Sequence, residues 1–243
     1  MLEVFAIRLA AGFALALLPI PRGAIEPRFY RLHLTIASCF LTVAAVFAWQ
    51  RSEDSFWLPF GLGFVATLFG VWAWSFEEYA FARYPALLAA PLALLASLNL
   101  LAAADPLRAF WDDLSAAWLL GLTTTAMLLG HWYLIAPNLT LVPLVRLHQG
   151  LFVSLVLRAV VVGVYLGSAR LAATSAWDTL TWLWLMPRVL AGLLGAAVLA
   201  WMARRAAEDS TQAATGILYV ATIFVFIGEL TDQLLRQHLR SEP

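Results

Sequence analysis

The chain has 243 residues, of which 63% are hydrophobic and 12% are charged, and its mean hydropathy is +0.83. Soluble domains carry about 25% charged residues, so this composition predicts an integral membrane protein that lies in a lipid bilayer. The 15 basic residues, all arginine, balance 15 acidic residues, which argues against nucleic acid as a partner. The single cysteine, Cys39, excludes an intrachain disulfide and a cysteine-rich zinc or iron–sulfur site within this chain.

Apolar runs of membrane-spanning length recur along the chain. About 20 residues, at a rise of about 1.5 Å each, cross the hydrocarbon core of a bilayer. Charged residues and prolines separate eight such runs, at approximately 3–20, 33–49, 56–75, 85–104, 115–136, 150–168, 179–203 and 212–235. Because the connections between them are short, residues 1–243 are predicted to form one all-α domain, a polytopic bundle of about eight transmembrane helices.

The arginines in the connections predict an orientation. Seven arginines lie in the connections 21–32, 76–84, 137–149 and 204–211, and five lie on the opposite side. Because arginine accumulates on the cytoplasmic side, both termini are expected outside. The first run has no basic segment before it and no clear cleavage site, which favours a retained span over a signal peptide. The lysine-free, Arg-, Ala- and Leu-rich composition is typical of a bacterial protein, so the inner cell membrane is the expected location.

Several charged residues fall within the predicted spans. Each costs about 2.5–3.5 kcal/mol at the centre of a span, so each needs a partner or a function. Arg8 and Asp232 are predicted near the outer ends of their spans, where solvation explains them. Arg188 and Glu229 are predicted at compatible depths in the middle to outer half. They are candidates for a buried ion pair between the last two helices, or for a proton relay or quinone-headgroup site.

Threonines share a helix face with candidate residues on two of the predicted spans. Thr215, Thr222 and Glu229 recur at seven-residue spacing and therefore share one face of the last span. Thr124 and His131 share a face of the fifth span in the same way. Both patterns predict polar stripes that face neighbouring helices and not lipid.

A second candidate site is predicted in the inner half of the membrane. At about 1.5 Å per residue, Arg158 lies about 12 Å and His131 about 8 Å from the inner ends of their spans, and Tyr133 follows His131 closely. Three interpretations fit His131. It could form hydrogen bonds at a helix end, take part with Tyr133 and Arg158 in a quinone-headgroup or proton-relay site, or ligate haem b with His33 as the second ligand. Haem is the least expected of the three.

The stretch "YVATIFVFIGELTDQLL" in the last span resembles the final helix of the membrane-anchor subunits of DMSO-reductase-type and polysulfide-reductase-type respiratory enzymes. The similarity lies in the Gly228-Glu229-Leu230 step near the end of that helix, in eight spans, and in outside termini. The resemblance implies a helical membrane subunit that exchanges electrons with quinol and docks an extrinsic iron–sulfur or oxidoreductase subunit.

The expected function is therefore that of a quinone-interacting or structural membrane subunit of a bacterial respiratory or electron-transfer complex. Catalysis by the chain alone is not expected, because no nucleophile–base set, metal-ligand cluster or phosphate-binding glycine loop occurs in the sequence. Two other classes remain open. A transporter of small solutes or ions would use the same intramembrane charges for coupling, and a purely structural or assembly protein would use them only to join helices.

Overall fold

The computed structural model describes residues 1–21, 23–49, 54–76, 83–101, 105–136, 139–172 and 177–241. Its helices are α1 (Leu2–Leu15), α2 (Pro27–Ala48), α3 (Asp54–Ala73), α4 (Arg83–Leu101), α5 (Pro106–Ile135), α6 (Val142–Ala172), α7 (Thr179–Val189), the π-helical segment η1 (Leu190–Gly195), α8 (Ala196–Asp209) and α9 (Thr211–Ser241). Every regular element within the described residues is helical. The predicted all-α fold is therefore confirmed.

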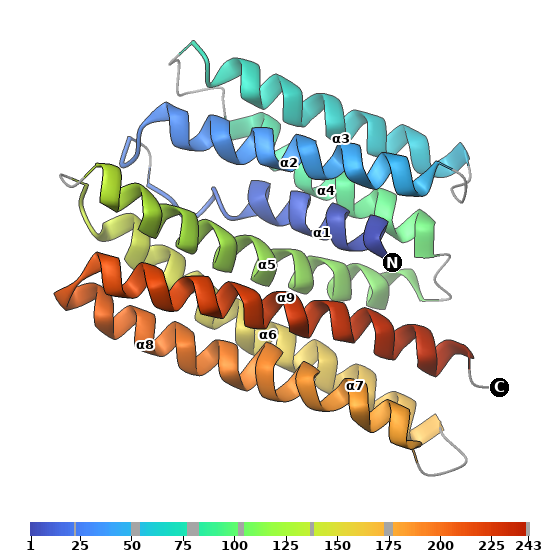
Figure 1. Ribbon diagram of the computed structural model, residues 1–243. Helices are drawn as coiled ribbons and strands as arrows, with labels where there is room; N and C mark the ends of the chain where they lie inside the picture. Colours follow the sequence, from blue (N-terminus) through green and yellow to red (C-terminus); the bar gives the residue numbers. More distant parts are fainter. Residues whose placement is uncertain are drawn as a thin grey trace.

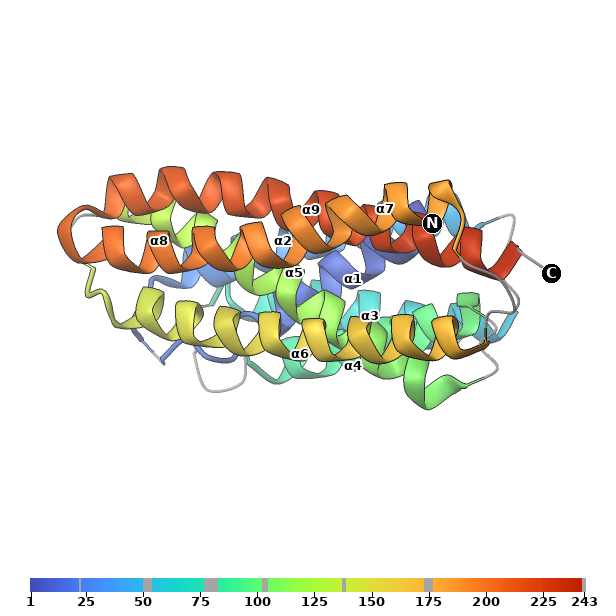
Figure 2. The ribbon, with the colours of Figure 1, turned by 90° about the horizontal axis from the view of Figure 1, so that it is seen from below.

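The helices run side by side along one long axis, and the two chain termini lie at the same end of the bundle (Figures 1 and 2). Helices α5, α6 and α9 have 30, 31 and 31 residues. At a rise of about 1.5 Å per residue, each is about 45 Å long. That length matches a bilayer with its headgroup regions, which measures about 40–45 Å.

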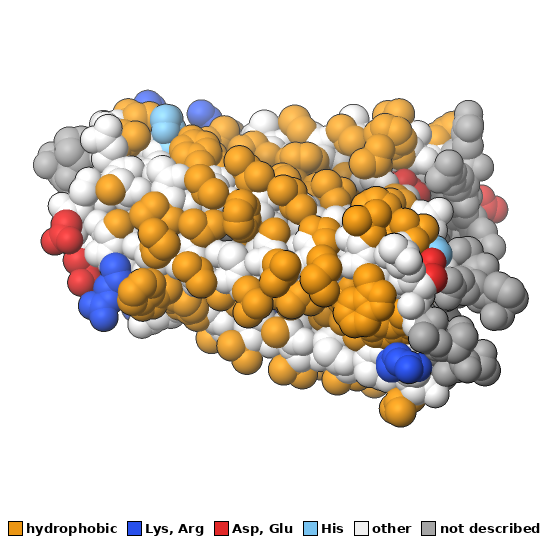
Figure 3. Space-filling model, turned by 60° about the horizontal axis from the view of Figure 1, so that its bottom comes forward, with side chains coloured by type: hydrophobic (Ala, Val, Ile, Leu, Met, Phe, Trp, Pro, Cys, Tyr) orange, Lys and Arg blue, Asp and Glu red, His pale blue; other side chains and the backbone are white. Residues whose placement is uncertain are grey.

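Six helical segments of the described chain are long and apolar enough to cross a membrane: α2, α3, α5, α6, the continuous α7–η1–α8, and α9. This count differs from the predicted eight. Helix α1 has only 14 residues, and the described apolar part of α4 is Leu88–Leu98. Large apolar side chains cover the middle of the bundle surface and charged side chains gather near its two ends (Figure 3). This distribution indicates that the chain lies in a membrane, with the apolar outer surface of the bundle in contact with lipid.

Three helix ends differ from the predicted boundaries. Helix α5 begins at Pro106 and not near residue 115, because the Asp105 carboxylate caps it by accepting a hydrogen bond from Arg108 N at 3.1 Å, and proline suits the first helical position. Helix α6 begins at Val142 and not near residue 150, and α9 continues to Ser241. Charged residues that the sequence placed in connections therefore lie inside helices.

Helix α1 lies in the interior of the bundle, where it contacts α2, α4 and α5. Ten of its 14 residues are buried, many of them alanine. A Cβ atom added at Gly121 of α5 would overlap the carbonyl oxygen of Gly12 in α1, so the two backbones touch directly. Small residues allow this close approach, as in other helix pairs within membranes.

Candidate functional site

Eight charged side chains are buried where α1, α5, α6, α7 and α9 meet. Four are arginines and four are carboxylates, and we call them the ion network: Arg8, Asp112, Asp113, Arg158, Arg188, Glu229, Asp232 and Arg236. No side chain of the set is more than 11% exposed. With every group ionised, the set has no net charge.

Arg158 of α6 is the centre of the ion network. Its Nε and Nη2 atoms donate to the two carboxylate oxygens of Glu229 at 2.9 and 2.6 Å, which makes a bidentate pair. Nη2 also lies 2.9 Å from Oδ2 of Asp232, and Nη1 donates to the Asp112 carboxylate. One guanidinium therefore joins α6 to both α5 and α9.

Arg188 reaches the same carboxylates from α7. Its Nη1 donates to Glu229 Oε1 at 3.0 Å, and its Nε lies 3.3 Å from Oδ1 of Asp232. One turn further, Gly192 in η1 lies against Gly228 of α9 so closely that a Cβ on either would overlap the other's Cα. The π-helical turn η1 therefore lies against α9 beside the ion pair, and π-helical turns are frequent at functional sites.

The other two arginines extend the ion network outward. Arg8 donates from Nε to Asp113 Oδ1 and from Nη2 to Asp112 Oδ2, both at 2.7 Å. Ser97 of α4 completes this part by donating to Asp113 Oδ2 at 2.5 Å. Each of these contacts joins one helix to another, so α1 and α4 are tied to α5 through Asp113.

Arg236 lies nearer the end of α9. It bridges Asp232 and Asp112, each at 2.7 Å, and its guanidinium carbon lies 3.9 Å from the centre of the Tyr165 ring. The aromatic face provides an additional favourable contact for the cation. Arg236 thus closes the ion network on the side toward the chain termini.

All four carboxylates of the ion network are paired. Every carboxylate accepts from at least one arginine. Within the described chain, three buried nitrogen atoms of these arginines form no hydrogen bond: Arg8 Nη1, Arg188 Nη2 and Arg188 Nε, the last of which lies 3.3 Å from Asp232 Oδ1. Ordered water molecules could satisfy these three donors.

The structure brings Arg188 and Glu229 together, as their predicted depths suggested, but it places Arg158 with them and not with His131. Counted at about 1.5 Å per residue from the described helix ends, Arg158 is about 24 Å and His131 about 6 Å from the end of the bundle opposite to the chain termini. Glu229 lies about 27 Å from the same end. The earlier start of α6 moves Arg158 to the depth of Glu229.

Arg8 and Asp232 also differ from the sequence-based interpretation. Both are 2% exposed, so solvation does not explain them. Each is held by the ion network, with Arg8 paired to α5 and Asp232 to arginines from α6 and α9.

The residues proposed for an inner quinone or haem site do not form one cluster. His131 is exposed on α5, and the Tyr133 hydroxyl donates to the backbone oxygen of Thr140 at 2.5 Å. His33 is buried on α2, with Nδ1 2.8 Å from its own helix at Phe29 O and its ring 4.1 Å from the Phe29 ring. The two histidines therefore occupy different surroundings, one exposed and one within the aromatic core.

The three threonines of the predicted stripes are buried, as expected for faces that contact other helices. Their hydroxyls, however, donate to the backbone four residues earlier in the same helix, at 2.7 to 2.8 Å for Thr124, Thr215 and Thr222. Among the described residues, these hydroxyl groups therefore form no hydrogen bond to another helix. Thr215 packs instead against Gly130 of α5, where a Cβ would lie 2.5 Å from the Thr215 hydroxyl.

Sequence reasoning missed Asp112, Asp113 and Arg236, because the residues before 115 and after 235 were taken as connections. A signal was present in the spacing. Glu229, Asp232 and Arg236 are three and four residues apart and so lie on one helical face. Extending that face beyond the apolar run would have predicted a longer α9.

In comparisons with known proteins, no family model, no curated protein and no solved structure matches this chain. The functional conclusion therefore depends on the geometry of the ion network and on its place in the bundle.

Proposed function

We propose that this chain is a structural membrane subunit, whose role is to hold a fixed helical platform in the bilayer and to support a partner there. The observation that carries the proposal is that the four buried carboxylates of the described residues all pair with arginines in a set of zero net charge. These pairs link α1, α5, α6, α7 and α9 at one depth.

A neutral set of ions in which every carboxylate is paired is suited to fixing helices and poorly suited to carrying protons. Protonating one carboxylate would leave an uncompensated arginine in a medium of low dielectric constant. A transport site would also need space for a solute. Two hollows of the described chain lie between α2 and α3, away from the ion network.

In this proposal the bundle has eight spans, with α1 and α4 as the two short ones. Each of these two helices runs antiparallel to the helix that follows it in the chain. The two termini lie at one end of the bundle, as an even number of membrane crossings requires (Figure 1). Helix α1 can be short because its neighbours bury it on most sides. Both termini are assigned to the outside of the inner membrane, in keeping with the arginine distribution.

The partner we propose is an extrinsic oxidoreductase or iron–sulfur subunit of a respiratory or electron-transfer complex. The support is the resemblance at the end of α9, where Gly228 and Glu229 hold the contact with the seventh span. In this role the chain contributes no catalytic residue of its own. His131, Tyr133 and Arg158 are not proposed as a joint quinone site, because Arg158 is engaged elsewhere.

Purification of the tagged chain in a mild detergent tests this function. We expect an extrinsic redox subunit to co-purify in a fixed ratio, and Glu229→Gln to reduce its yield only as far as it reduces the folded fraction of the chain. Proteoliposomes of the purified chain are expected to show no solute uptake. Uptake that Glu229→Gln abolishes while the bundle stays folded would establish a transporter instead.

A further inference from the structure

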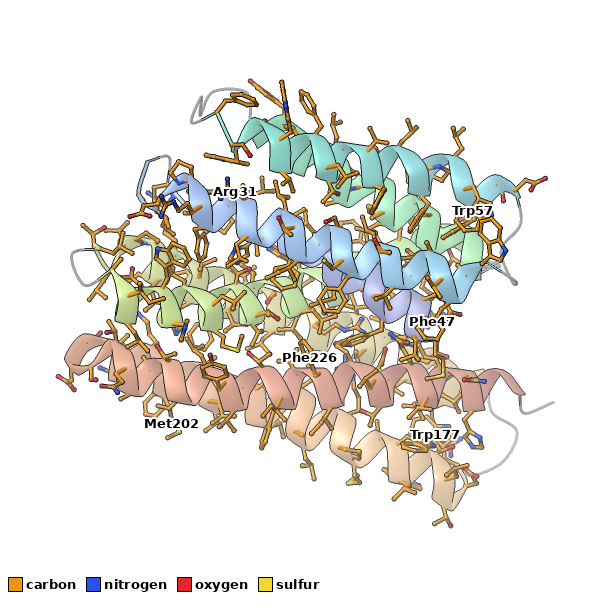
Figure 4. All side chains as sticks on the ribbon, turned by 45° about the horizontal axis from the view of Figure 1, so that its top comes forward. Arg31, Phe47, Trp57, Trp177, Met202 and Phe226 are labelled. Carbon is orange, nitrogen blue, oxygen red and sulfur yellow. The ribbon has the colours of Figure 1, made fainter. Side chains whose placement is uncertain are left out.

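A polar pocket of about 460 Å³ lies between the first turns of α2 and the end of α3. It is lined by Glu26, Pro27, Arg28, Arg31, Trp74 and Ser75. In Figure 4, Arg31 marks its position near the end of the bundle opposite to the C-terminus. The pocket is therefore remote from the ion network, and a helix end at this level lies at the depth of lipid headgroups.

Two arginines form the cationic wall of the pocket. Arg28 and Arg31 are three residues apart, so their side chains leave the same face of α2, and both are exposed. Within the described chain, neither has a carboxylate within ion-pair distance. The Glu26 side chain does not cap the helix, although it occupies the N-cap position, so its carboxylate stays available at the pocket rim.

Trp74 gives the pocket an aromatic side, and its ring is stacked on a neighbouring tyrosine. The Trp74 ring lies parallel to the Tyr30 ring, with 4.2 Å between centroids and an interplanar angle of 9°. The Tyr30 hydroxyl donates to Pro21 O at 3.4 Å, which ties this pair to the chain before α2. Leu32 of α2 follows the pocket residue Arg31, and Trp72 of α3 precedes the pocket residue Trp74 by two positions; both are exposed and provide apolar surface on these helices.

We propose that this pocket binds the headgroup of an ethanolamine phospholipid. Arg28 and Arg31 bind the phosphate diester, and the Glu26 carboxylate accepts hydrogen bonds from the primary ammonium group. The acyl chains then follow the exposed apolar surfaces of α2 and α3. Two cations and one anion in one pocket match a zwitterionic headgroup with a donor ammonium better than they match a free phosphate or a purely anionic lipid.

Retention of lipid by the full-length protein tests the proposal. The protein is equilibrated with mixed micelles that contain phosphatidylethanolamine, phosphatidylglycerol and phosphatidylcholine in equal amounts, and bound lipid is counted by native mass spectrometry. We expect preferential retention of phosphatidylethanolamine and an approximately tenfold loss of it in Arg28→Gln/Arg31→Gln, the loss that about 1.4 kcal/mol of binding would cause. The matched control is Arg204→Gln/Arg205→Gln, an arginine pair near the same end of the bundle, which is expected to retain lipid as the wild type does.

A second variant isolates the ammonium contact. Glu26→Gln is expected to bind phosphatidylethanolamine and phosphatidylglycerol about equally, because it keeps the phosphate ligands. Glu26, Arg28, Arg31 and Arg205 are exposed, and Arg204 is partly exposed in a surface ion pair with Glu208, which contributes little to stability. Each variant should therefore unfold close to the wild-type temperature in lipid-free detergent. Equal losses in the two arginine pairs, an unchanged lipid preference in Glu26→Gln, or saturable binding of inorganic phosphate without retained lipid would each overturn the proposal.

Discussion

Arg158→Gln is expected to destabilise the protein by about 3–5 kcal/mol, the cost of leaving a buried charge without its partner. The variant removes the guanidinium that contacts Glu229, Asp112 and Asp232, and it leaves the ion network with a net charge of −1. Glutamine is too short to replace a bidentate pair. The free energy of unfolding, measured by denaturant titration in detergent, gives the result directly.

Arg146→Gln is the matched control for this variant. Arg146 lies on the same helix but is exposed, so its substitution is expected to change stability by no more than about 0.5 kcal/mol. Equal effects of the two substitutions would show that burial within the ion network does not determine the stability of α6.

Gly121→Val is expected to cost about 3 kcal/mol, the upper range for overpacking a core. The new side chain would overlap the backbone of Gly12, which cannot move aside as a flexible side chain can. Helix α1 would be displaced from α5, and Arg8 would lose its geometry toward Asp112 and Asp113. A lower midpoint of thermal unfolding, together with easier proteolysis of the N-terminal segment, would report this displacement.

Gly163→Val on α6 is the control, because a Cβ at Gly163 meets no atom within 4 Å. We expect wild-type stability from it. If both valine variants behaved alike, the close contact between α1 and α5 would not be a determinant of the fold.

The sequence predicted much of the fold because hydrophobic run length is a direct physical signal in a bilayer. It predicted helix ends less well, since α5, α6 and α9 continue beyond the apolar runs with charged or polar turns. The positions of these helix ends determine the depth at which each charged residue is predicted to lie. Starting α6 near residue 150 shifted Arg158 by about 12 Å, or eight residues at about 1.5 Å each, toward His131 and away from Glu229.

The sequence also did not predict which helices are in contact within the bundle. Arg188 and Glu229 could be paired from depth alone because their helices follow one another in the chain. The contact of Arg8 with Asp113 joins residues 105 positions apart, and no periodicity in either segment predicts it. It depends on α1 lying against α5, which the small residues Gly12 and Gly121 permit.

A double-mutant cycle on Arg8 and Asp113 tests most directly whether the ion network is structural. Each single variant, Arg8→Met or Asp113→Asn, unbalances the charge and is expected to cost about 3 kcal/mol or more. The double variant leaves three arginines facing three carboxylates. We predict that it recovers about 1–3 kcal/mol relative to the sum of the single losses and still co-purifies with the extrinsic subunit proposed above. Purely additive losses, or a stable double variant that has lost a transport or electron-transfer activity, would contradict a structural role.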